Sequence, residues 1–138
     1  MDWRMSFYDA VRKKKLEDSL CTTETIKNLV YTEFTGFMDP IQDLAEITIE
    51  GEVHKYRVYD KILKVAYLED KIFFSQISLT LSGNETKETP IAELFREGGV
   101  FLKKDERLGQ PGEYISKKTI DSIFYRAFTH GSALRFRD

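Results

Sequence analysis

The chain has 138 residues, a formal net charge of −2, 41% hydrophobic residues and 13% aromatic residues. This length is typical of one domain, residues 1–138, and the apolar content excludes an intrinsically disordered chain. No apolar run approaches the roughly 20 residues of a membrane helix, and no signal-peptide core follows Met1, so we expect no membrane partner. Cys21 is the only cysteine. An internal disulfide is therefore excluded, and a cytoplasmic location is favoured.

A first helix is expected from Ser6, which suits the N-cap position, to about Leu20. Its apolar face consists of Phe7, Ala10 and Val11.

A second helix is expected to begin at Thr22 or Thr23 and to stop at Gly36. Its buried stripe has helical spacing and consists of Ile26, Leu29, Val30 and Phe34. A short turn that starts with Asp39-Pro40 should then lead to Leu44.

Four strand-like runs follow, separated by tight polar breaks, and they predict an antiparallel meander. The runs are Glu46–Ile49, Glu52–Tyr59, Lys61–Leu68 and Lys71–Ser82. In the fourth run, one parity carries the apolar residues Phe73, Ile77, Leu79 and Leu81. This period of two predicts that Phe73 and its same-parity neighbours face the core.

After the meander, the polar segment to Glu88 is interpreted as an exposed loop. Thr89-Pro90 is expected to open a short helix, Ile91–Glu97, which Gly98-Gly99 stops. Val100–Leu102 is a candidate fifth strand, and Lys104–Gly112 is the most loop-like stretch of the chain.

The last helix has the clearest pattern in the chain. Ser116 suits its N-cap and Gly131 its stop. Its apolar residues fall at positions 0, 3, 4, 7 and 8 of the stripe and are Ile120, Ile123, Phe124, Ala127 and Phe128.

These elements predict an α+β fold in which a four- to five-stranded antiparallel meander is covered on one face by N- and C-terminal amphipathic helices. The expected core consists of Phe7, Val11, Ile26, Leu29, Val30, Phe34, Ile47, Ile49, Val65, Phe73, Ile77, Leu79, Leu94, Ile120, Phe124 and Phe128.

Patterns typical of enzymes are missing from the sequence. It contains no glycine-rich nucleotide loop, no GxSxG elbow, no HExxH and no paired CxxC. We assign neither His54 nor His130 as a general base, and the place of His130 after a helix favours a cationic ring at the helix C-terminus instead. We therefore disfavour an enzyme, without excluding an unrecognised one, and we expect no cofactor and no metal site.

Two basic groups are candidate binding sites on this weakly acidic chain. Lys55, Arg57 and Tyr59 share one parity of a strand, where two cations beside an aromatic ring could hold an anion. The other group is the run Arg12, Lys13, Lys14 and Lys15. Solvated surface charge is the alternative interpretation of both groups.

Three functional hypotheses remain open. The leading one is a non-enzymatic, intracellular binding module, a small accessory or inhibitor protein of bacterial or phage type, that acts on a protein partner. The second is a binder of an anionic or nucleotide-like small molecule, and the third is an unrecognised enzyme. The negative net charge makes nucleic acid a weaker candidate, and a homo-oligomer is left open. A concave pocket would favour the small ligand, and an exposed apolar patch would favour the protein partner.

Overall fold

The computed structural model describes residues 2–19, 22–104, 113–132 and 134. The helices are α1 (Trp3–Ser19), α2 (Thr23–Phe37) and α3 (Lys117–Thr129), with a 3-10 segment, η1 (Asp39–Leu44), after α2. The strands are β1 (Ala45–Glu50), β2 (Val53–Val58), β3 (Lys61–Tyr67), β4 (Lys71–Leu79), β5 (Glu85–Glu97), β6 (Val100–Lys103) and β7 (Glu113–Tyr114).

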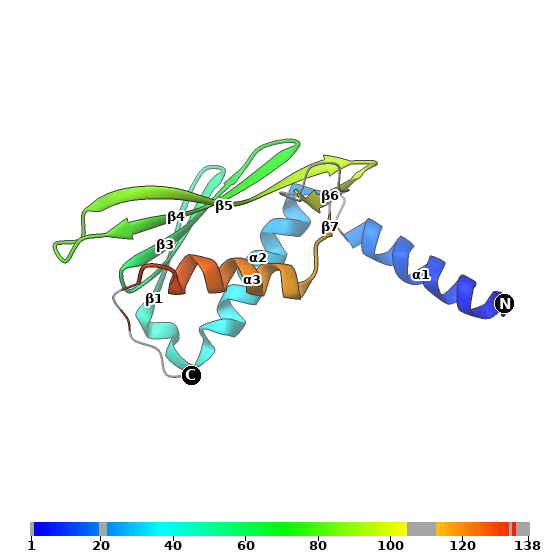
Figure 1. Cartoon of the computed structure of the whole chain (residues 1–138), viewed down its shortest axis with the longest axis horizontal. Coiled ribbons are helices and arrows are strands. Elements are labelled where there is room, and N and C mark those ends of the chain that lie inside the picture. Colours follow the sequence, from blue (N-terminus) through cyan, green and yellow to red (C-terminus); the bar gives the residue numbers. More distant parts are fainter. Residues whose placement is uncertain (1, 20–21, 105–112, 133, 135–138) are drawn as a thin grey trace.

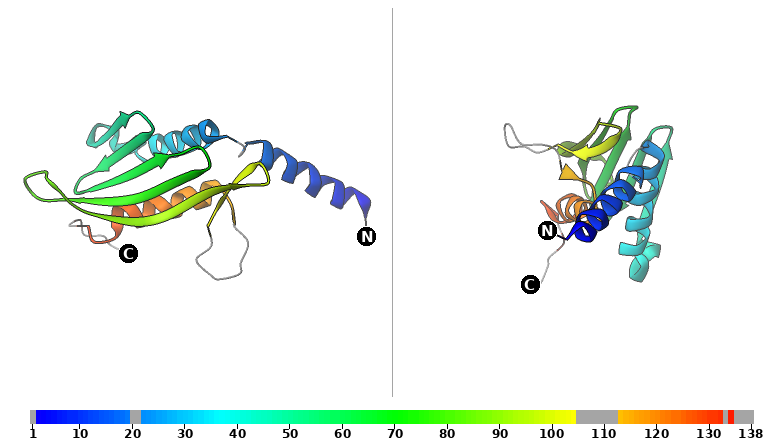
Figure 2. Two further views of the ribbon diagram at one scale, coloured as in Figure 1. Left: turned by 90° about the horizontal axis from the view of Figure 1, so that it is seen from above. Right: turned by 90° about the vertical axis from the view of Figure 1, so that its right-hand side faces the viewer.

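The strands form one antiparallel sheet in the order of the sequence, β1 to β7. The predicted α+β class is therefore confirmed, and the sheet has more strands than the four or five expected. Figure 1 shows α2 and α3 together on one face of this sheet. Among the described residues, no helix lies on the opposite face (Figure 2).

Helices α2 and α3 follow the predicted pattern closely. Thr22 caps α2 through a hydrogen bond from the Thr25 backbone N–H to its Oγ1, 3.1 Å. Ser116 caps α3 in a reciprocal capping box with Thr119. Because both stripes face the sheet, they form its main core with the inner residues of β2 to β6. At the centre, the ring of Phe34 lies 4.8 Å from that of Tyr56 and 5.9 Å from that of Phe124.

The prediction for β4 was wrong about which parity faces the helices. Ile72 and Phe74 belong to the main core, whereas Phe73 is 37% exposed on the opposite face. Both parities of this strand carry large apolar residues, so the alternation alone does not identify the helix-covered face. Ile77 is buried as predicted, but it lies on the same face as Phe73, beside its strand partner Ile62.

The helix predicted at Ile91–Glu97, and the loop expected before it, are instead strand β5. Residues 85–95 pair with β4 along nearly its whole length, and this ladder overrides the local helix-start signal of Thr89-Pro90. A register shift leaves Ile91 between the paired residues Pro90 and Ala92. A proline, which cannot donate to a ladder, is tolerated at such a bulge.

Helix α1 was predicted to contribute Phe7 and Val11 to the core, and this was wrong. It begins at Trp3 rather than at Ser6, because Asp2 accepts a hydrogen bond from the backbone N–H of Arg4, 3.0 Å. The helix projects away from the body of the molecule (Figures 1 and 2). The expected core residues Phe7 and Val11 are accordingly 56% and 51% exposed.

Other corrections follow from position in the sheet. Ile49 is exposed because it lies on the edge strand β1, beyond the reach of the helices. Val100–Leu102 does return as a strand, β6, and most of the predicted loop Lys104–Gly112 falls outside the described residues.

Within the part of the chain that the structure describes, no helix is both long and apolar enough to cross a membrane.

Candidate functional site

The three residues predicted as one binding face, Lys55, Arg57 and Tyr59, do not act as one group. Lys55 lies 3.4 Å from Glu85 of β5 in an ion pair, with its side chain largely covered. Arg57 and Tyr59 instead line a hollow at the end of the sheet where η1 and the β2–β3 turn lie.

The helix-free face around Lys55 is held by ion pairs that cross several strands. Lys64 of β3 lies 3.0 Å from Glu88 of β5, and Ser75 donates to the same carboxylate at 3.0 Å. The hydrogen bonds from Lys64 and then Ser75 hold the pKa of Glu88 below its ordinary value. Contacts from β2 and β3 to β5 require the sheet to curl, which the register shifts in the β4–β5 ladder allow. These lysines are therefore engaged within the fold.

The hollow, which we name the turn-end hollow, has a volume of about 570 Å³. Four large apolar or aromatic side chains contribute to its wall, Leu44, Tyr59, Leu79 and Leu81. Three carboxylates, those of Asp43, Glu46 and Asp60, lie around a single guanidinium, that of Arg57. Thr80 completes the lining. The hollow is thus apolar with an excess of negative charge.

Arg57 is positioned by two contacts inside the turn-end hollow. Its guanidinium lies 3.8 Å from Glu46, its cross-strand partner on β1, and its Nε donates to the carbonyl of Tyr59 at 3.3 Å. Asp60, next in the turn, accepts a hydrogen bond from Ser132 at 3.0 Å. Arg57 is therefore paired with Glu46 in a partly exposed ion pair.

Tyr59 is held in an uncommon backbone conformation at the rim of this hollow. Its φ is +57°, the left-handed region that bulky residues rarely adopt. Such a conformation costs of order 1–3 kcal/mol, so the surrounding turn must impose it. The ring remains more than half exposed.

A second candidate surface is the apolar side of α1. Phe7, Ala10 and Val11 form a shallow concavity with Lys14 and Lys15. The Trp3 ring lies 6.4 Å from that of Phe7 and extends the surface by one turn. We name Trp3, Phe7, Ala10 and Val11 the α1 stripe. Phe7, Ala10 and Val11 lie four, seven and eight positions after Trp3, so the four residues share one side of the helix.

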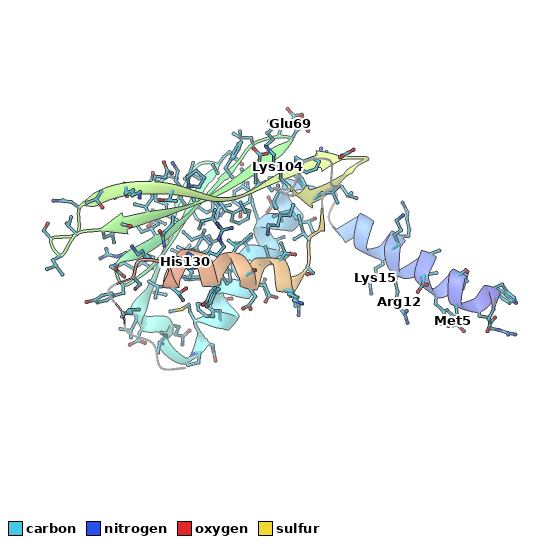
Figure 3. The ribbon with its side chains drawn as sticks, in the orientation of Figure 1. Met5, Arg12, Lys15, Glu69, Lys104 and His130 are labelled. Carbon is cyan, nitrogen blue, oxygen red and sulfur yellow. The ribbon has the colours of Figure 1, made fainter. Side chains whose placement is uncertain are left out.

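The predicted basic run, Arg12 to Lys15, lies on this projecting helix. Its four side chains are exposed, and Arg12 forms a solvent-exposed ion pair with Asp9, 3.6 Å. Figure 3 shows Arg12 and Lys15 on α1, away from the body of the molecule. Helical spacing places Lys14 in line with the α1 stripe, and Lys15 and Lys13 about 100° from it in opposite directions around the helix. The run therefore divides between two sides of the helix.

Sequence reasoning missed Trp3 and most of the turn-end hollow. Trp3 could have been found by extending the apolar spacing of Phe7 and Val11 back by one helical turn. The hollow has no comparable signal, because its lining comes from η1, three strands and two turns that are distant in the sequence.

No group of three or more metal-ligating side chains lies together among the residues that the structure describes. Comparison of the chain with protein-family models, with curated proteins and with solved structures gives no match.

Proposed function

We propose that this chain is a non-enzymatic binding module that engages a protein partner through α1. The observation that carries the proposal is the exposure of the α1 stripe on a projecting helix, with Trp3 67% exposed and Phe7 and Val11 more than half exposed. Burial of one such side chain is worth about 1.5–3 kcal/mol. Contiguous apolar surface of this kind marks interaction sites.

The chemistry of α1 indicates what such a partner must offer. An amphipathic helix binds by laying its apolar side into a hydrophobic groove, with anchors at helical spacing. Lys14 and Lys15 flank the stripe, and Arg4 lies over the Trp3 ring at 5.2 Å. An apolar groove with an acidic rim is therefore the complementary surface.

A small anionic ligand is less well supported than a protein partner. Arg57 and Tyr59 do line a concave hollow, as that hypothesis requires. An anion there would meet three carboxylates and a single guanidinium that already forms an ion pair with Glu46. We therefore keep the protein-binding hypothesis. The accessory or inhibitor role, of bacterial or phage type, rests on small size, and the cytoplasmic location rests on the lone Cys21.

A photo-crosslinking experiment tests this proposal. A benzophenone amino acid replaces Phe7 in one protein and Met5 in a matched control, because Met5 lies on the other side of α1 and is also exposed. In lysate of the native host, the Phe7 probe should form a specific adduct that the Met5 probe does not form. Mass spectrometry then identifies the adduct.

The adduct should disappear when unlabelled wild-type chain competes for the partner, and it should persist when the competitor carries Trp3→Ser with Val11→Ser. Loss of two interface anchors of this kind typically removes at least about 2 kcal/mol of binding free energy. Equal adducts from the Phe7 and Met5 probes would exclude the α1 stripe as the recognition surface.

A further inference from the structure

We infer that a partner for the α1 stripe is a second copy of this chain, whose turn-end hollow receives the helix in a head-to-tail contact. This inference rests on the proposed function, because it names the partner of the same helix.

Charge and polarity match between these two surfaces. The helix presents Trp3, Phe7 and Val11 beside two lysines. The turn-end hollow presents leucine and tyrosine side chains beside an excess of carboxylates. Leu81 is fully exposed at the rim, and Leu44 is 65% exposed. Apolar contact would shield these side chains from water, while the opposite charges would set the orientation.

The positions of the two surfaces require that they meet between molecules. Helix α1 projects from one end of the molecule, and the β4–β5 turn, which supplies Leu81, lies at the other end (Figure 1). A 17-residue helix is about 25 Å long, and α1 points away from the body, so it cannot reach its own hollow. The contact is therefore heterologous: each copy can donate one helix and accept another.

A parallel pairing of two α1 helices fits the surface less well. Lys14 continues the spacing of Trp3, Phe7 and Ala10, and in a parallel pair it would face the same lysine of the second copy. Like charges at such an interface are unfavourable. The acidic hollow offers the lysines a partner of opposite sign.

Sedimentation equilibrium of the full chain measures this association. The average mass should rise above the 16.1 kDa of one chain as concentration increases. A single helix in a hollow makes a small interface, so we expect the rise between about 10 μM and 1 mM. It should weaken with added salt, because the charges are exposed and screened.

Two variants separate the halves of the contact. The helix variant carries Trp3→Ser and Phe7→Ser, and the hollow variant carries Asp43→Lys and Leu81→Lys. All four residues are exposed, so neither variant should unfold. Matched controls are Met5→Ser on the other side of α1, and Gln42→Lys with Leu68→Lys at exposed positions outside the hollow.

Each of the two variants should remain a monomer alone, and the controls should associate like wild type. An equimolar mixture should form a complex of twice the monomer mass and nothing larger, because only one helix and one hollow remain intact. If the wild-type chain stays monomeric at all concentrations up to about 1 mM, its association is weaker than a specific contact requires, and the inference is overturned. A mixture that fails to associate would also overturn it.

These outcomes leave the proposed function separately testable. If wild type stays monomeric while the Phe7 probe still forms its specific adduct with a different host protein, the second copy is excluded and the binding helix stands. If the chains associate but neither variant pair affects the association, a different surface, such as the β1 edge, makes the contact.

Discussion

Gln76 links the sheet to the C-terminal end of α3 through its side-chain amide. The Nε2 group donates to the carbonyl oxygens of Ala127 and His130, both at 2.8 Å. The last carbonyls of a helix have no partner within the helix, so this amide satisfies groups that would otherwise be costly to bury.

We therefore expect Gln76→Ala to lower the free energy of unfolding by about 0.5–1.5 kcal/mol, the net worth of a typical hydrogen bond, since the bond to Ala127 is partly buried and the bond to His130 is exposed. Urea denaturation measures the change. Gln42→Ala at the exposed η1 serves as control and should change stability by less than about 0.5 kcal/mol. An equally small effect of Gln76→Ala would mean that water replaces the amide.

Tyr67 and Tyr56 place two phenol groups in the main core. Their hydroxyl oxygens are buried without a hydrogen-bond partner of good geometry among the described residues. The two phenol groups are close enough to interact electrostatically. Burial is the main cause that raises the pKa of Tyr56 to about 12, and burial also raises the pKa of Tyr67 well above its ordinary value. The folded state therefore resists deprotonation of both groups.

This predicts a loss of stability at alkaline pH. Above about pH 10 the unfolded chain releases these protons while the native state retains them, so unfolding becomes more favourable as the pH rises. Below pH 10 both states are protonated and the contribution does not change. Tyr67→Phe should flatten the fall in urea midpoint between about pH 10 and pH 11, whereas Tyr125→Phe, at an exposed site, should not. Identical alkaline slopes in the two variants would contradict the prediction.

At the scale of elements, α3 is the helix whose burial the sequence predicts best. Phe124 is 3% exposed, and its ring lies within 6.1 Å of the ring of Phe128. We expect Phe124→Ala to destabilise the protein by about 3–5 kcal/mol, since it removes a large aromatic from a packed core. Tyr125→Ala, on the outer side of the same helix, controls for helix propensity. A loss below about 1 kcal/mol for Phe124→Ala, by denaturant melting, would show that this side of α3 tolerates a cavity.

Strand β4 offers a direct test of which face carries the main core. Phe74→Ala should cost about 3–5 kcal/mol, because this ring packs among the helices and strands of the main core. Phe73→Ala removes the same number of atoms from the partly exposed opposite face and should cost clearly less. Equal losses in thermal or urea melts would mean that the helix-free face is packed as tightly as the helix-covered one.

The elements that could be predicted are those whose signal is local. The apolar stripes of α2 and α3 and the turns of the meander can be predicted from residues only a few positions apart in the sequence. Strand β5 could not be predicted, because its structure comes from pairing with β4 rather than from its own residues. The fate of α1 could not be predicted either, since an apolar stripe shows that a helix has a binding side but not what covers it.

At the scale of the whole molecule, the difference between local sequence signals and tertiary contacts also explains which candidate sites could be predicted. The basic run on α1 and the pair Arg57 and Tyr59 are close in the sequence and could be proposed from it. Asp43 and Leu81 join Arg57 only because the meander returns three times to the same end of the sheet. The cross-sheet ion pair of Lys55 likewise depends on the curl of the sheet. Sites made by tertiary structure therefore need the fold before they can be identified.

The separation between α1 and the body leads to a last prediction. The side chains of residues 2–15 are all exposed, so their removal takes little buried surface from the folded body. A chain that lacks residues 2–15 should keep the free energy of unfolding within about 0.5–1 kcal/mol of wild type, as for changes away from packed sites. It should nevertheless lose the concentration-dependent rise in mass, because the α1 stripe is gone. Urea melts and sedimentation of the same preparation measure both. A large loss of stability would instead place α1 against the body in solution, where the α1 stripe would be covered by the chain itself.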